Sequence, residues 1–186
     1  MVFFLDKKTL VLVHGWGGTH ALHWQNWLKQ KAIESKKMNV VFPLMPNYDF
    51  PVLSEWLSTL EKNVSAPRQT ILVGHSLGCP IILRYLEKLS SGDKVGLVVL
   101  VSGFARPLGI TEIDGFVSQP FDWGKIKQSA KKFVVVFSDN DPFISVKESA
   151  YLSDSLGVKP IIEKNAGHIT APDFGPYQKL WLIISE

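Results

Sequence analysis

The stretch "QTILVGHSLGCPII", residues 69–82, joins two apolar patterns at a single serine. Residues 70–74 form a short run rich in branched side chains, as in a buried strand, whereas the apolar spacing from residue 80 is that of a helix. Ser76 lies between them in "GHSLG", with a glycine two positions before it and another two positions after it. Such a turn exposes the serine hydroxyl, and the glycines let strand and helix approach closely. We therefore predict that Ser76 is a nucleophile rather than a packing serine.

Short apolar runs alternate with helical patterns along the whole chain. The runs predict six buried strands, at residues 9–13, 39–43, 70–74, 95–101, 133–137 and 158–163. They show no regular polar face, which is typical of a parallel sheet covered on both sides. Helical spacing occurs between them, at residues 23–33, 52–64, 80–89 and 145–156. The alternation predicts an open, mostly parallel six-stranded α/β sheet with helices on both faces.

Length and composition favour one domain over residues 1–186. With 186 residues, 46% of them apolar, the chain can bury one sizeable core and is short for two. The connection at residues 102–132 is about thirty residues long, against roughly two to six for ordinary loops of this class. It is too short for a second domain, and we expect a helix within residues 121–133 and irregular chain before it.

The composition also argues against several classes of protein. The apolar runs are shorter than the roughly 18 residues that span a bilayer, and "MVFFLDKK" lacks the features of a signal peptide, so we expect neither membrane attachment nor secretion. The one cysteine, Cys79, cannot form an internal disulfide, which favours the cytoplasm. The net charge is only +3 and the lysine pairs are scattered, so we expect no nucleic-acid partner.

Four of the predicted strands are followed at once by residues that acyl-transfer chemistry uses. These segments are "HGWGG" (14–18), "GHSLG" (74–78), "SDND" (138–141) and "NAGH" (165–168). The carboxyl ends of parallel strands lie at one edge of a sheet, where ligands of such sheets bind. We therefore expect these four segments to lie close together.

A serine hydroxyl needs a base to take its proton, and the base needs an acid to orient it. His168 is the predicted base, because the "NAG" turn before it places it in a loop at the ligand edge. Asp141 and Asp139 are both candidates for the acid. We favour Asp141, which lies farther into its loop and can reach a histidine, and we interpret Asp139 as a turn residue bonded to its own backbone.

The tetrahedral intermediate of acyl transfer needs backbone donors for its oxyanion. The N–H of Leu77, directly after the predicted nucleophile, is one candidate. The other comes from the glycine-containing loop after the first strand, where we favour the N–H of Trp16 over that of Gly17. Dinucleotide binding is the rival interpretation of this loop, but its glycine pattern would need Gly at position 20, where His20 stands.

Other candidate residues lie outside this constellation. His20 and His23 are three positions apart, but no third ligand is evident, so we expect neither a metal nor an organic cofactor. Phe121, Trp123 and Phe143 fall in segments after strands and are candidates for lining a substrate pocket. The tryptophans with helical spacing are interpreted as core residues: Trp24, Trp27, Trp56 and Trp181.

At the level of families, the chain resembles the small YdeN-like serine hydrolases, which are related to retinoblastoma-binding protein 9 within the α/β-hydrolase superfamily. The resemblance covers nearly the whole chain and runs in order through "HGWGG", "HWQNWLKQK", "MPNYDFP", "EWLSTLEK", "GHSLGCPIILRYLEKL", "LVVLVSGFA", "FDWGKIKQSAKK", "SDNDPFIS" and "NAGH". Ser145 departs from the family pattern, because a proline often stands there. The resemblance implies a compact hydrolase without a large lid domain.

The resemblance also implies a triad of Ser76, Asp141 and His168, which match the family's positions one by one. We accordingly predict a serine hydrolase that cleaves a small carboxylic ester, or a thioester or amide, through an acyl-enzyme. The serine argues against the dehalogenase and epoxide-hydrolase variants of the fold, because resemblance to those would demand an aspartate there. The alternative hypothesis is a non-catalytic module that uses the cleft to bind a partner protein.

Overall fold

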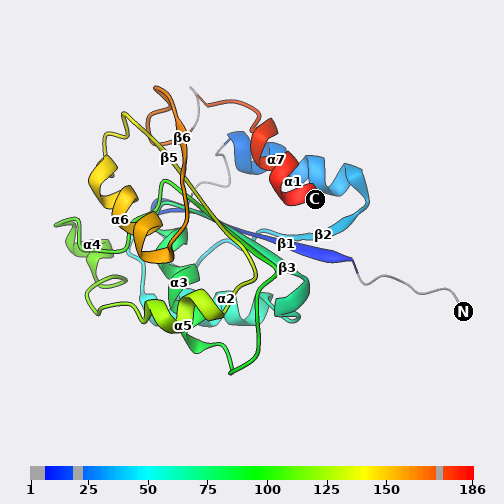
Figure 1. Cartoon of the computed structure of the whole chain (residues 1–186), viewed down its shortest axis with the longest axis horizontal. Helices are drawn as coiled ribbons and strands as arrows, with labels where there is room; N and C mark the ends of the chain where they lie inside the picture. The colour runs from blue at the N-terminus through cyan, green and yellow to red at the C-terminus, as the bar shows by residue number, and fades with distance from the viewer. Residues whose placement is uncertain (1–6, 19–22, 171–173) are drawn as a thin grey trace, which may run out of the picture.

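The strands form an open sheet in which every neighbouring pair is parallel. The computed structural model describes residues 7–18, 23–170 and 174–186 (Figure 1). In these ranges the strands are β1 (Lys8–Val13), β2 (Met38–Val41), β3 (Thr70–His75), β4 (Leu97–Val101), β5 (Phe133–Ser138) and β6 (Ile161–Glu163). Their order is β2-β1-β3-β4-β5-β6, with β2 and β6 at the edges. The predicted six-stranded α/β sheet is therefore confirmed.

Helices cover both faces of this sheet. They are α1 (His23–Ser35), α2 (Leu53–Asn63), the 3-10 turn η1 (Pro67–Gln69), α3 (Gly78–Lys88), α4 (Thr111–Asp114), α5 (Trp123–Gln128), α6 (Val146–Leu156) and α7 (Gln178–Ser185). Figure 1 shows α1 and α7 together on one face, and α2, α3, α5 and α6 on the other. The chain moves outward from β1 to β2 and then returns past β1 to β3. Because crossovers are right-handed, this reversal puts α1 and the following helices on opposite faces.

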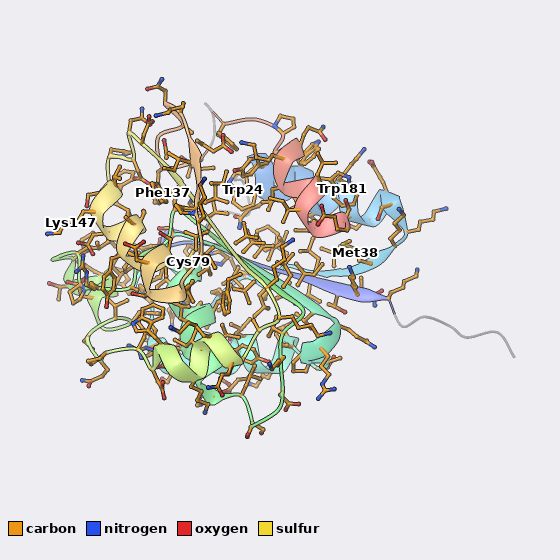
Figure 2. The ribbon with its side chains drawn as sticks, in the orientation of Figure 1. Trp24, Met38, Cys79, Phe137, Lys147 and Trp181 are labelled. Carbon is orange, nitrogen blue, oxygen red and sulfur yellow. The ribbon has the colours of Figure 1, made fainter. Side chains whose placement is uncertain are left out.

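Alternation along the strands divides the buried side chains into two cores. In β1, Val11 and Val13 belong to the core that contains α2 and α3, whereas Leu10 and Leu12 belong to the core that contains α1 and α7. Trp56 is completely buried in the first core and Trp24 in the second. Figure 2 shows Trp24 and Trp181 on the α1 and α7 side of the sheet, away from Cys79.

Three strands differ from the prediction by more than one residue at an end. Strand β2 ends at Val41, two residues before Pro43, which has no N–H to donate to a ladder. Strand β4 begins at Leu97, because Val95 forms only an isolated parallel bridge with Ala130. Strand β6 is limited to Ile161–Glu163, directly after Pro160.

Two of the α-helices were not predicted. Helix α4 lies within the connection that was expected to be irregular, and α7 follows the last strand. A short apolar run such as "LWLII" suits a strand or a helix equally well, and only its contacts decide. Leu180 and Ile184, four residues apart, are both buried against the sheet. Ser145, the departure from the family pattern, caps α6 by accepting the N–H of Glu148.

Each helix in the described ranges is too short or too polar to cross a membrane.

Helix α3 lies unusually close to the strands beneath it. A side chain at Gly74 in β3 would place its Cβ 2.6 Å from the carbonyl oxygen of Gly78, the first residue of α3. A Cβ on Gly78 would in turn collide with the carbonyl oxygen of Val13 at the end of β1. These obstacles are backbone atoms, which cannot rotate away. Glycine at both positions therefore lets the start of α3 rest directly on β1 and β3.

Replacing Gly74 with alanine should therefore destabilise the fold. Forcing one extra carbon into a packed interior costs about 1–3 kcal/mol, and a loss of 1 kcal/mol lowers Tm by roughly 2–4 °C in a chain of this size. Thermal unfolding followed by circular dichroism measures the effect. Gly115→Ala is the matched control, because a Cβ there meets nothing within 4 Å and φ is −55°. Equal Tm values for the two variants would contradict the packing argument.

Candidate active site

Ser76 occupies the sharp turn between β3 and α3. Its φ of +52° lies in the left-handed region, which costs a non-glycine residue about 1–3 kcal/mol. The turn is fixed by two backbone hydrogen bonds: the N–H of Ser76 donates to the carbonyl of Val101 (2.9 Å), and the N–H of Cys79 donates to that of Ser76 (2.9 Å). The side chain is partly exposed and lines a pocket that His168 also lines.

His168 and Asp141 are in direct contact. Nδ1 of His168 lies 2.7 Å from Oδ2 of Asp141, whose side chain is fully buried. The other carboxylate oxygen, Oδ1, accepts the backbone N–H groups of Phe143 (2.9 Å) and Ile144 (3.0 Å). Burial acts to raise the pKa of Asp141, but the hydrogen bond to His168 and the two backbone bonds outweigh it and hold that pKa below its ordinary value. Asp141 is therefore an ionised carboxylate in hydrogen-bond contact with the imidazole.

The loops after β5 and β6 are joined by a ladder of side chains. Ser138 Oγ accepts the N–H of Ala166 (3.0 Å), Asp139 Oδ1 that of Asn165 (2.8 Å), and Asn140 Oδ1 that of Gly167 (2.8 Å). Asp139 lies in a turn and bonds its own backbone, as predicted, and in addition to the bond with Asn165 it forms an ion pair with Lys164, which was not predicted. Three successive residues thus bind the three residues before His168.

The backbone carbonyl of His168 is bound by two other side chains, one at the end of β3 and one directly after β4. His75 Nε2 lies 2.9 Å from this oxygen, and Ser102 Oγ donates to it at 3.3 Å. A carbonyl only accepts, so Nε2 of His75 carries the proton. Burial and the neighbouring His168 lower the pKa of His75 to about 3. These contacts were not predicted. The only indication in the sequence was that His75 and Ser102 stand at or directly after the end of a strand, which does not identify a hydrogen-bond partner.

Two backbone N–H groups beside Ser76 are available to an oxyanion. Within the described part of the chain, the N–H groups of Leu77 and Trp16 donate to no other group, whereas that of Gly17 donates to the carbonyl of Tyr48 (3.1 Å). The Trp16 loop is tied down by His14, whose Nε2 accepts the N–H of Met45 and whose Nδ1 bonds the carbonyl of Gly15. The geometry therefore favours Trp16 over Gly17 as the second donor.

A pocket of about 220 Å³ lies beside Ser76. Its lining residues are Trp16, Ser76, Phe104, Leu108, Ile110, Ile113, Phe143, Ile144 and His168. Phe143 is one of the three aromatic residues predicted to line it.

The other two predicted aromatics, Phe121 and Trp123, are absent from the pocket lining, which corrects the prediction. Phe121 is buried beneath the guanidinium of Arg84, 3.8 Å from the ring centroid, and Trp123 packs against Phe121 and Tyr151. These two rings serve instead to pack α5 against α3 and α6. The position of these residues in the connection after β4 did not indicate which helices they would pack against.

The described residues contain no cluster of potential metal ligands. Among those residues, no group of three His, Cys, Asp or Glu side chains could hold a metal ion. His20 lies outside the described residues, as does the side chain of His23.

The parallel sheet, with its serine at the turn after β3, defines an α/β-hydrolase fold. The model of the serine hydrolase family matches residues 10–185. The YdeN hydrolase of Bacillus subtilis is 34% identical over 167 residues, covering 87% of this chain and 85% of YdeN. The chain belongs to the serine hydrolase family.

Solved structures and a second relative agree with this assignment. The crystal structure of the YdeN gene product matches with a TM-score of 0.90 and 31% identity, covering 96% of this chain and 97% of that one. The serine hydrolase RBBP9 of Rattus norvegicus is 28% identical over 170 residues, 90% of this chain and 89% of RBBP9. Esterase PE8 matches at a TM-score of 0.63 and 19% identity over 96% of this chain and 92% of its own, which shows the fold alone.

The buried His75 should make stability depend on pH. Its pKa is about 3 in the folded protein against 6.5 ordinarily, so between these values the unfolded chain binds a proton that the folded chain does not. Stability from this group is therefore complete above pH 6.5 and is lost as pH falls, by up to about 1.4 kcal/mol per pH unit. His75→Gln, which keeps an N–H donor without titrating, should lack this component. Urea unfolding of both proteins between pH 4 and pH 7 measures how the free energy of unfolding changes with pH. The wild type should show a steeper change, by up to about 1.4 kcal/mol per pH unit. Equal slopes in the two proteins would refute the assignment.

Proposed function

We propose that this protein is a carboxylesterase-like serine hydrolase that cleaves small carboxylic esters through an acyl-enzyme, with thioesters and amides as further substrates. The observation that carries the proposal is the 2.7 Å contact between His168 and Asp141, at the pocket that His168 shares with Ser76. In this proposal Ser76 is the nucleophile, His168 the general base and Asp141 the orienting acid. The reaction as proposed requires no metal or organic cofactor.

The contact with Asp141 determines which imidazole nitrogen can act. Nδ1 of His168 points to the carboxylate, so its proton stays there and Nε2 is left with a lone pair. Nε2 takes the hydroxyl proton of Ser76 as Oγ forms a bond to the substrate carbonyl carbon. The resulting imidazolium is stabilised by the ionised Asp141.

Negative charge develops on the substrate carbonyl oxygen in this step. The N–H groups of Leu77 and Trp16 are proposed to donate to that oxygen. A donor of this kind contributes roughly 10²–10³ in kcat. Both belong to turns fixed in advance, by the bonds around Ser76 and by His14 respectively. Little reorganisation is then needed when the charge appears.

The intermediate collapses when the bond from the carbonyl carbon to the leaving oxygen breaks. His168 returns its proton to that oxygen, and the alcohol departs from the acyl-enzyme on Ser76. A water molecule then attacks the acyl carbon with His168 again as base, which releases the carboxylic acid and restores the hydroxyl.

Ser76→Ala tests the proposal directly. Without the attacking oxygen, hydrolysis of p-nitrophenyl acetate should fall by at least about 10⁴-fold, because loss of the nucleophile removes the acyl-enzyme route. A fluorophosphonate probe should label the wild-type protein and leave Ser76→Ala unlabelled. Intact mass measures the labelling, with Ser91→Ala at an exposed turn as the matched control that is labelled normally.

The same measurement addresses the alternative hypothesis of a partner-binding module. A folded wild-type protein that neither reacts with the probe nor cleaves the ester would overturn the proposed hydrolase and favour the module. Labelling that persists in Ser76→Ala would show that another residue is the nucleophile.

A further inference from the structure

The pocket beside Ser76 is graded from an exposed mouth to a buried end. At the mouth, Trp16 and Phe143 keep 43% and 68% of their surface exposed. At the inner end, Phe104, Ile113 and Ile144 are almost completely buried. A substituent that enters beside the serine therefore meets buried apolar side chains.

The described part of the chain contributes no Asp, Glu, Lys or Arg side chain to the lining of this pocket. Among the described residues, each one that lines the pocket is aliphatic or aromatic, apart from Ser76 and His168. Placing a charge in such an environment without a partner is strongly unfavourable. The pocket volume of about 220 Å³ is also below the roughly 300 Å³ at which pockets for drug-sized ligands begin. The matching ligand group is short, apolar and uncharged.

Part of the wall comes from residues 104–113, the segment after β4. Asp114 fixes its turn, because Oδ1 accepts the N–H of Leu108 (2.8 Å) and Oδ2 that of Gly109 (2.9 Å). Arg106 fixes its outer side through two bonds to Glu148 of α6, at 2.9 and 2.8 Å. None of these polar side chains lines the pocket. The segment is thus held from outside while its aliphatic residues face inward.

Helix α3 secures the chain immediately after this segment. Nε of Arg84 donates to the carbonyl of Phe116 at 3.0 Å, and its terminal nitrogens donate to the carbonyls of Gln119 and Pro120. Glu87 accepts the N–H of Asp122. Residues 104–113 are therefore anchored to α6, and the chain directly after them to α3, so the wall is preformed.

We propose, given the hydrolase function above, that residues 104–113 form a preformed acyl pocket selective for short, uncharged acyl chains, with Ile113 at its end limiting chain length. A small pocket lined by buried apolar side chains suits the acyl group, which stays attached to Ser76 after the first step. The leaving alcohol must escape, and the exposed mouth at Trp16 and Phe143 provides its route.

Ile113→Ala tests the limit on chain length. In the wild type, kcat/KM for p-nitrophenyl octanoate should be at least roughly tenfold below that for the butyrate, because unfavourable fit of even one methylene changes rates by about tenfold or more. Shortening Ile113 opens the end of the pocket, so the ratio of octanoate to butyrate should rise by roughly tenfold. p-Nitrophenyl hemisuccinate, similar in length to the butyrate but charged, should be a poor substrate of both proteins.

Val117→Ala is the matched control, because Val117 is as deeply buried as Ile113 in the same connection but does not line the pocket. It should leave the octanoate to butyrate ratio unchanged. Leu108 is a half-buried residue that also lines the pocket, so Leu108→Ala should raise the ratio as Ile113→Ala does. Leu108→Ala replaces Ile113→Ala as the test if the Ile113 variant fails to fold.

The experiment separates this proposal from the function on which it rests. If the fluorophosphonate probe labels Ser76 but both lining variants keep the wild-type ratio, the acyl pocket is refuted and the hydrolase stands. A series of alkyl butyrates varies the alcohol instead of the acyl chain. If the lining variants change kcat/KM according to alcohol length and not according to acyl length, the pocket belongs to the leaving group and the proposal is overturned. Failure of labelling in the wild type would refute the hydrolase itself.

Discussion

The direct packing of α3 on the ends of β1 and β3 is the constraint on which the rest of the site depends. With no Cβ at Gly74 or Gly78, the first turn of the helix rests on backbone atoms of both strands. The chain must then reverse within two residues, and Ser76 takes a left-handed φ to do so. The strain persists because flanking hydrogen bonds to Val101 and Cys79 fix the turn. The turn thus presents the side chain of Ser76 to the pocket.

The second requirement is a fixed position for His168, which follows the short edge strand β6. Edge strands have one neighbour only, so β6 alone would hold the loop weakly. Ser138, Asp139 and Asn140 compensate by binding the backbone of the three residues before the histidine. Asp141 then binds the ring, while His75 and Ser102 hold its carbonyl. Contacts from three adjacent strand ends thus converge on one residue, which is possible because the strands are parallel.

Some parts of this arrangement could be predicted from sequence and others could not. The strands were found from short runs of branched residues, and their ends shifted mainly near Pro43 and Pro160, where ladder bonding stops. The sequence predicted that residues 138–141 and 165–168 lie close together, because the carboxyl ends of parallel strands lie at the same edge of a sheet. The pocket wall did not follow, because Leu108, Ile110 and Ile113 lie in a segment without regular periodicity. Phe121 and Trp123 were misplaced for the same reason, since position in a connection does not reveal packing partners.

The sequence by itself determined the alternation of strands and helices, the strained turn at Ser76 and the chemical types available after each strand. These properties depend on spacing within a few residues and on the identity of each side chain. Only the tertiary structure decided which of them meet: that Asp141 faces the imidazole while Asp139 faces Lys164, and that Trp16 keeps its N–H available while Gly17 does not. Those choices depend on backbone positions separated by many residues along the chain, which become neighbours only when the sheet has assembled in its particular order.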